Sequence, residues 1–133
     1  MGAADFFDTG KMMSYAPRAP KRTKEQFMPK YLLEVSYTAE GAKGVLKDGG
    51  TKRRDAARAS VESVGGTLEA LYFAFGQYDV VCVVDMPDAA SMAAASLSLS
   101  ASGAVTGQTR ALITVEEIDA ASKKTPSYTP PGR

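Results

Sequence analysis

Two apolar segments joined by one tight turn constrain the fold of this chain more than any other feature. Residues 67–75 carry apolar side chains at both even and odd positions, and residues 77–86 contain an unbroken apolar run at 80–84. Segments of this length that are rich in β-branched and aromatic residues are typical of β-strands. Gly76, between them, can adopt the positive φ of a tight hairpin. We therefore predict a hairpin whose strands need apolar cover on both faces.

The remaining segments place this hairpin in a β-α-β-β-α-β order. Residues 31–37 alternate in polarity, which predicts a strand with one fully covered face. A helical pattern runs from about 38 to 64 with an interruption at Gly49-Gly50, where Thr51 is predicted to cap a new helix. A second helix of small residues spans 89–101, and 109–117 is predicted as the last strand. The order predicts an α+β, ferredoxin-like βαββαβ fold, in which a four-stranded antiparallel sheet carries two helices on one face.

Two helices can cover only one face of such a sheet. Because the second and third predicted strands are apolar on both faces, a monomer would expose an apolar surface that monomeric proteins rarely show. We predict that the sheet of a second subunit covers this face and forms a dimeric α+β barrel. The alternative is that the N-terminal segment folds back over the face.

Charge divides the chain into three parts. We predict a flexible extension at 1–29, a domain at 30–120 and a tail at 121–133, with Met28 as a candidate start of the functional domain. Residues 1–30 hold six basic and three acidic side chains, residues 31–120 hold seven and twelve, and residues 121–133 hold three basic side chains and none that is acidic. An acidic domain argues against a nucleic-acid partner, which requires a basic face.

The chain contains no histidine. Zinc sites that use histidine, Ser-His-Asp triads and Cys-His dyads therefore cannot be built from it, and we expect neither a metal nor a cofactor. Its single cysteine, Cys82, cannot form an intramolecular disulfide and is expected to be a small buried hydrophobic residue. The sequence lacks an apolar run long enough to span a membrane, so we expect a cytoplasmic protein without a membrane partner.

The first candidate site is a cluster of basic residues around two glycines. The free amides of a glycine-led helix start, with cationic side chains beside them, would suit a phosphate or carboxylate. The alternative is a solvated basic stripe or a structural salt bridge, with Arg58 and Glu62 as an ordinary helical pair. The candidate ligand-binding residues are Lys47, Gly49, Gly50, Lys52, Arg53 and Arg54, together with Gly76 of the hairpin.

The second candidate site is the hairpin itself. Asp79 could face a cavity as a general base whose pKa burial would raise, or it could bind backbone amides of the turn. Tyr78 is its candidate partner in catalysis. A pocket between sheet and helices could be lined by Tyr31, Tyr37, Tyr72 and Tyr78.

Five short blocks follow one another along the chain: MPKYLL at 28–33, GGTKRR at 49–54, Gly65-Gly66, YFAF followed by GQYD at 72–79, and ASGAV at 101–105. In these blocks, which span about 28–120, the sequence resembles the bacterial GYD-domain family. The resemblance implies a small ferredoxin-like domain that forms a dimeric α+β barrel, and it implies no particular activity. The sequence departs from the family at Gln77, which separates Gly76 from Tyr78-Asp79.

Two functions from different classes follow. The first is an oligomeric ligand-binding or regulatory module that recognises a small anionic or aromatic molecule. The second is a cofactor-independent enzyme of the dimeric α+β barrel type, monooxygenase- or isomerase-like, that uses Tyr78, Asp79 and Arg53. The absence of histidine and of a visible nucleophile–base pair favours the first.

Overall fold

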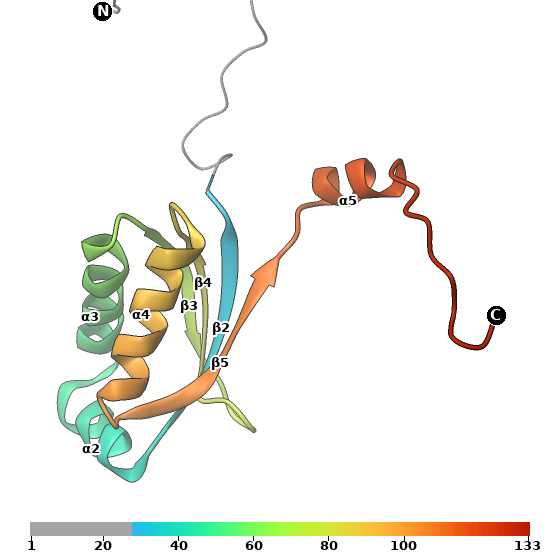
Figure 1. Ribbon diagram of the computed structural model, residues 1–133. Coiled ribbons are helices and arrows are strands. Elements are labelled where there is room, and N and C mark those ends of the chain that lie inside the picture. Colours follow the sequence, from blue (N-terminus) through green and yellow to red (C-terminus); the bar gives the residue numbers. More distant parts are fainter. Residues whose placement is uncertain (1–27) are drawn as a thin grey trace, which may run out of the picture.

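The fold is ferredoxin-like, as the order of segments predicts (Figure 1). The computed structural model describes residues 28–133, so the predicted extension at 1–29 lies almost entirely outside the described residues. The helices and strands within them are β2 (Lys30–Tyr37), α2 (Ala39–Asp48), α3 (Gly50–Ser63), β3 (Thr67–Phe73), β4 (Val80–Asp85), α4 (Ala89–Ala101), β5 (Val105–Leu112) and α5 (Val115–Ser122).

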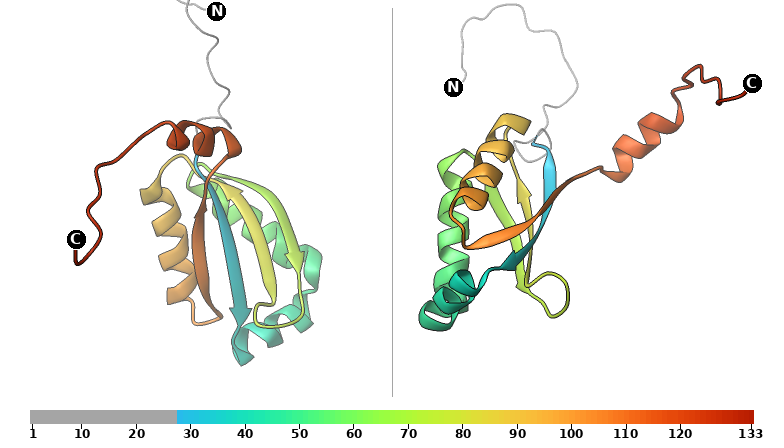
Figure 2. Two further views of the ribbon diagram at one scale, coloured as in Figure 1. Left: turned by 90° about the vertical axis from the view of Figure 1, so that its right-hand side faces the viewer. Right: turned by 60° about the horizontal axis from the view of Figure 1, so that its bottom comes forward.

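The described strands form an antiparallel sheet in the order β3-β4-β2-β5. Helices α3 and α4 lie over one face of the sheet, and no described helix lies over the strands on the other, which we call the open face (Figures 1 and 2). In β2, Leu33 and Val35 point toward the helices, and their neighbour Leu32 points to the open face opposite Val83 and Arg110. The alternation predicted for residues 31–37 is therefore confirmed.

The first predicted helix is split into α2 and α3 at Gly49, whose φ is 81°. Thr38 begins α2 by accepting a hydrogen bond from the Gly41 amide at 3.2 Å. The prediction that Thr51 caps the second half is wrong. The N-cap is Gly49, two residues before Thr51, so α3 starts at Gly50, and Gly49 has no side chain with which to accept a hydrogen bond.

The core lies between the sheet and the helices. Val84 and Met86 are fully buried there, and Leu33, Val80 and Cys82 belong to the same cluster. Met28, which precedes β2, is also buried. The described part of the domain therefore begins with a residue that contributes to packing.

Asp85 is a buried charged residue on the open face. Its carboxylate accepts a hydrogen bond from Lys30 Nζ at 2.7 Å, and the same ammonium group contacts Glu69. Glu69 reaches this position because the register between β3 and β4 shifts between Leu68 and Ala70. At the end of the sheet where β2 begins, the charged side chains of Lys30, Asp85 and Glu69 are thus paired with one another.

The prediction of a last strand at 109–117 is wrong. The last strand, β5, runs from Val105 to Leu112, and residues 115–122 form helix α5 in place of a strand continuing to 117. Thr114 and Glu117 form a capping box: the Glu117 amide donates to Thr114 Oγ1 at 3.0 Å, and the Thr114 amide donates to Glu117 Oε1 at 2.9 Å. Helix α5 also crosses the boundary predicted between domain and tail at residue 121.

Within residues 28–133, no helix has the length and apolar character needed to cross a membrane.

Candidate functional site

A cavity of about 200 Å³ lies between the helix-covered face of the sheet and helices α3 and α4. It exists because the inner faces of both helices carry small side chains: Ala56, Ala57 and Ser60 in α3, and Ala95 in α4. The cavity opens toward solvent, because Arg53 and Phe73, which line it, are both partly exposed. The apolar part of the lining is Leu33, Val35, Val61, Leu68, Leu71, Phe73, Val80, Val84, Met86, Met92, Leu99 and Val105.

Of the described residues that line the cavity, Arg53 is the charged one. It lies in the second turn of α3, and its side chain is 40% exposed, so it reaches both the cavity and solvent. Its Nη1 lies 3.6 Å from an oxygen of Asp48. Because 3.6 Å exceeds the length of a good charge-assisted hydrogen bond, this ion pair leaves the guanidinium able to bind another acceptor.

Tyr37 lies beside Arg53 in the lining. Burial raises the pKa of its hydroxyl above the ordinary value, and the neighbouring guanidinium of Arg53 acts in the opposite direction. The phenol is therefore a neutral hydrogen-bonding group near neutral pH. Arg53 and Tyr37 together give an otherwise apolar cavity one polar corner.

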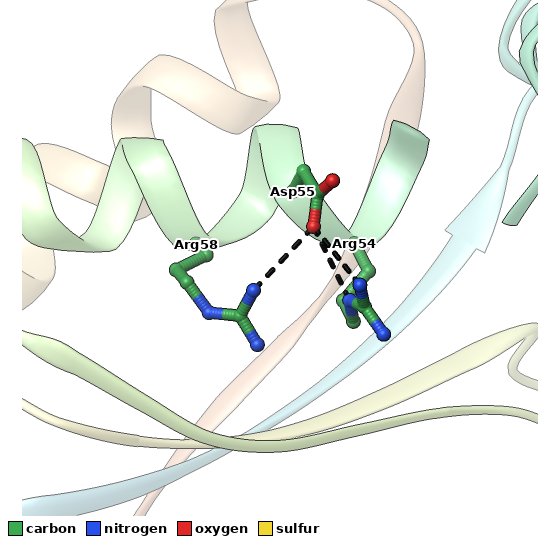
Figure 3. Close-up of polar contacts among 3 residues, drawn as sticks. All are labelled: Arg54, Asp55 and Arg58. Atoms are coloured by element: carbon green, nitrogen blue, oxygen red, sulfur yellow. Dashed lines mark hydrogen bonds and ion pairs between the residues drawn. The ribbon is translucent and has the colours of Figure 1, made fainter. Parts of the chain in front are cut away.

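The other members of the predicted basic cluster lie outside this cavity. Lys52 is 72% exposed and shares Asp48 with Arg53, and Lys47 is exposed in the last turn of α2. Arg54 and Arg58 approach the same oxygen of Asp55 from opposite sides, at 3.2 and 3.4 Å (Figure 3). Much of the cluster is therefore a set of solvated helical ion pairs, each of which contributes little to stability.

The two glycines have separate roles in this segment. Gly49 provides the break between α2 and α3, where its φ of 81° is a conformation that suits glycine. Gly50 lies against the ring of Phe73, since a Cβ atom at Gly50 would meet Phe73 Cε2 at 3.3 Å. Phe73 lines the cavity, so the start of α3 adjoins the cavity through this ring.

The hairpin residues are held away from the cavity. Gly76 has the predicted positive φ, 121°. The predicted tight turn is wrong, because β3 ends at Phe73 and β4 begins at Val80, so a longer loop joins the two strands. The Asp79 carboxylate accepts a hydrogen bond from the Tyr37 amide at 2.8 Å, and the Asp79 amide donates to the carbonyl oxygen of Val35 at the same distance. Neither Tyr78 nor Asp79 is among the described residues that line the cavity. The structure thus brings Arg53 and Tyr37 together in the cavity lining, whereas Asp79 contacts the backbone amide of Tyr37 outside that lining.

We expect Asp79→Ala to lower the free energy of unfolding by about 1–2 kcal/mol, because the half-buried Tyr37 amide would lose its acceptor. Asp79→Asn keeps an acceptor oxygen and should cost less than half as much. Urea unfolding followed by circular dichroism measures both. If the Asp79→Ala variant were as stable as the unaltered protein, Asp79 would not have this structural role.

Cys82 is a buried free thiol that lines the cavity. Burial raises its pKa to about 11 from the ordinary value of 9.0. The neutral thiol therefore stabilises the folded state below the unfolded pKa, and this contribution is lost as pH rises through about 11.

We expect iodoacetamide to alkylate Cys82 slowly in the folded protein at about pH 8, and at the rate of an ordinary cysteine after unfolding in denaturant. Mass spectrometry of timed samples gives both rates. Equal rates in the two states would show that the thiol is accessible.

Two features of the site were not identified from the sequence, namely Asp48 and the small side chains of α3. Asp48, which holds both Lys52 and Arg53, could have been found from its i,i+4 spacing to Lys52. The small residues of α3 that make room for the cavity carry no signal of their own, because alanine and serine are common on any helix. Of the four tyrosines predicted to line a pocket, Tyr37 does so, and Tyr72 is 71% exposed on the open face.

The model of the GYD domain family matches residues 31–122. This chain belongs to the GYD domain family. The match ends at the last residue of α5, so this helix is part of the GYD domain. A comparison with curated proteins finds no match.

Among solved structures, the GYD domain is similar to a crystal structure of MtbAldR, with a TM-score of 0.49 and 14% identity over 86% of this chain and 67% of that one. It is also similar to a glycine-to-threonine mutant of Rv3291c, with a TM-score of 0.44 and 13% identity over 80% of this chain and 63% of that one.

Proposed function

We propose that this GYD protein is a ligand-binding module that takes a small carboxylate with an apolar body into the cavity between its sheet and helices. The observation that carries the proposal is the position of Arg53, a cationic side chain that lines a cavity whose other walls are almost entirely apolar. Ligand sites in proteins have this composition, with mostly apolar walls and a few polar groups that fix orientation.

The size of the cavity limits the apolar body of the ligand. An apolar cavity of about 150 Å³ accepts benzene. The 200 Å³ available here therefore suit one aromatic ring or a short branched chain with a small substituent, and exclude fused ring systems unless the helices move.

The polar corner defines the head group. Arginine presents donors in a planar fork that matches a carboxylate, and the hydroxyl of Tyr37 can supply a further donor. Asp48 is an internal competitor for the guanidinium, and its ion pair with Arg53 is long at 3.6 Å. A ligand carboxylate would thus replace a weak contact by a stronger one.

The enzyme hypothesis receives less support. It requires Tyr78, Asp79 and Arg53 to converge on one substrate, whereas Asp79 accepts the amide hydrogen of Tyr37 and Arg53 lines the cavity without either hairpin residue. Among the described residues, the cavity lining offers a cation and a phenol but no carboxylate base. A binding role fits these groups better than proton abstraction does.

The proposal includes a homodimer in the cytoplasm. Leu32, Val81 and Val83 line the open face of the sheet next to the exposed ring of Tyr72. A second copy packed on this face would remove them from water and form the predicted α+β barrel. The single free cysteine suits a reducing compartment.

Isothermal titration of the full chain with benzoate, phenylacetate, 3-methylbutanoate and inorganic phosphate tests the binding proposal. We expect saturable binding of at least one organic carboxylate at one site per chain, and binding of its neutral alcohol analogue at least about tenfold weaker. If no carboxylate binds, or if the alcohols bind equally well, the proposed function is wrong.

A further inference from the structure

Helix α5 and the residue pair before it project from the domain as an arm, which we define as residues 113–122 (Figure 1). The apolar side chains of the arm lie in solvent: Ile113 is 64% exposed, Val115 is 74% exposed and Ile118 is 53% exposed. Within the described part of the chain, α5 has no extensive contact with any other helix or strand. The arm thus carries apolar residues that its own domain leaves uncovered.

The composition of α5 indicates a helix with one contact face. At about 100° per residue, Val115, Ile118 and Ser122 fall on one side of α5, and Glu116 and Ala120 fall on the opposite side. An isolated helix of eight residues is marginal in water, even with the capping box formed by Thr114 and Glu117. Its apolar side therefore needs a surface to pack against.

The arm and the open face of the sheet lie on the same side of the molecule. Figure 1 shows α3 and α4 on one side of the sheet and α5 on the other, and the left view of Figure 2 shows α5 beyond the ends of the strands, which it leaves uncovered. A single chain therefore carries exposed apolar residues on the arm and on the open face, and both lie on the side of the sheet opposite α3 and α4. A copy related by a two-fold axis can cover both at once, because each subunit then gives its arm and receives the other's.

The charges on the open face are compatible with burial against such a copy. Glu34 forms an ion pair with Arg110 at 3.1 Å and accepts a hydrogen bond from Gln108 Nε2 at 2.9 Å. At the end of the sheet near the arm, Lys30 pairs with Asp85 and Glu69. Charged side chains that are already paired within one chain can be covered by a partner without leaving an uncompensated charge.

We propose that the arm docks on a second copy of this chain and locks the homodimer by exchange of α5 between subunits. The inference rests on the homodimer proposed above and adds the element that holds the two copies together. The arm belongs to the matched family domain, which extends to residue 122.

Light scattering coupled to size-exclusion chromatography over a range of concentrations tests the arm with two matched variants of the full chain. Ile118→Glu places a charge on the apolar side of α5, and Ala120→Glu places the same charge on the opposite side. Both positions are exposed in the single chain, so neither change should disturb its fold. We expect Ile118→Glu to raise the dissociation constant of the dimer at least about tenfold, and Ala120→Glu to leave it unchanged.

The outcomes separate the arm from the dimer. A single-chain mass for the unaltered protein at every concentration would overturn both proposals. If the unaltered protein is a dimer and Ile118→Glu weakens it no more than Ala120→Glu does, the proposed role of the arm is wrong and the homodimer stands. The same conclusion follows if both variants lose thermal stability and dimerisation to the same extent.

A photocrosslink gives an independent readout of what the arm contacts. Ala121→Cys carries a benzophenone label on the arm, while the buried Cys82 stays unlabelled. Covalent pairs of chains support the exchange. Crosslinks confined to one chain, including links to residues 1–27, would mean that the arm packs on its own subunit.

Discussion

The Arg53→Met variant is expected to bind benzoate at least about tenfold more weakly than the unaltered protein. Methionine keeps an unbranched apolar side chain that can still line the cavity, and it removes the donors that would hold the carboxylate. A hydrogen bond to a charged group is worth about 1.5–3 kcal/mol, which corresponds to a loss of about ten- to a hundredfold in affinity. Isothermal titration measures this loss directly.

Lys52→Met is the matched control for Arg53→Met. Lys52 pairs with the same Asp48 carboxylate at the same 3.6 Å distance, but it is 72% exposed and does not line the cavity. We expect its affinity for benzoate to stay within about twofold of the unaltered protein. Similar losses in both variants would mean that general positive charge, and not a site formed by Arg53, attracts the anion.

Asp48→Asn gives a change in the opposite direction. Removal of the competing carboxylate frees Arg53, so the affinity for benzoate should rise by about two- to fivefold, the value of a solvent-accessible ion pair. An unchanged or lower affinity would show that Asp48 does not compete for the guanidinium.

Gly41→Ala is expected to cause the largest loss of stability. A Cβ atom at this buried position would lie 2.1 Å from the carbonyl oxygen of Ala104 and 3.0 Å from Tyr37 Cδ1. The Ala104 carbonyl also accepts the Thr38 amide at 3.0 Å, so the loop before β5 cannot move away without loss of that bond. We expect a net cost of roughly 3 kcal/mol and a fall in melting temperature of about 10 °C.

Gly44→Ala in the same helix is the control for Gly41→Ala. A Cβ atom at Gly44 would meet no atom within 4 Å. Alanine there should therefore stabilise the protein by up to about 1 kcal/mol through helix propensity alone. Calorimetry that found both variants equally stable would show that α2 does not pack against the loop at Ala104.

The sheet and its helices could be predicted because each rests on a local pattern. The alternation at 31–37 indicated which residues of β2 face the helices, and Gly49-Gly50 marked the break between α2 and α3. The end of the last strand was harder to predict from the sequence, because Leu112 and Ile113 resemble the apolar centre of a strand. Thr114 and Glu117 carried a capping signal that outweighs this pattern, since their side chains accept hydrogen bonds from two backbone amides at the start of α5.

The candidate site was less accessible to sequence reasoning. The basic cluster drew attention to Arg53, but only the packing of α3 on the sheet distinguishes its side chain from the exposed Lys52. The position of Asp79 depends on the register of the hairpin against β2, which places its carboxylate at the Tyr37 amide. Contacts of this kind join residues about forty positions apart, so no local pattern reveals them.

The central claim is that a small carboxylate enters the cavity between sheet and helices. Strand β4 offers an internal comparison, because Val80 and Val84 line the cavity and Val81 and Val83 face the open side. Intermolecular nuclear Overhauser effects from the ring protons of bound benzoate to the valine methyl groups therefore locate the ligand. We predict contacts to Val80 and Val84 and none to Val81 and Val83; contacts to Val81 and Val83 alone would contradict the claim.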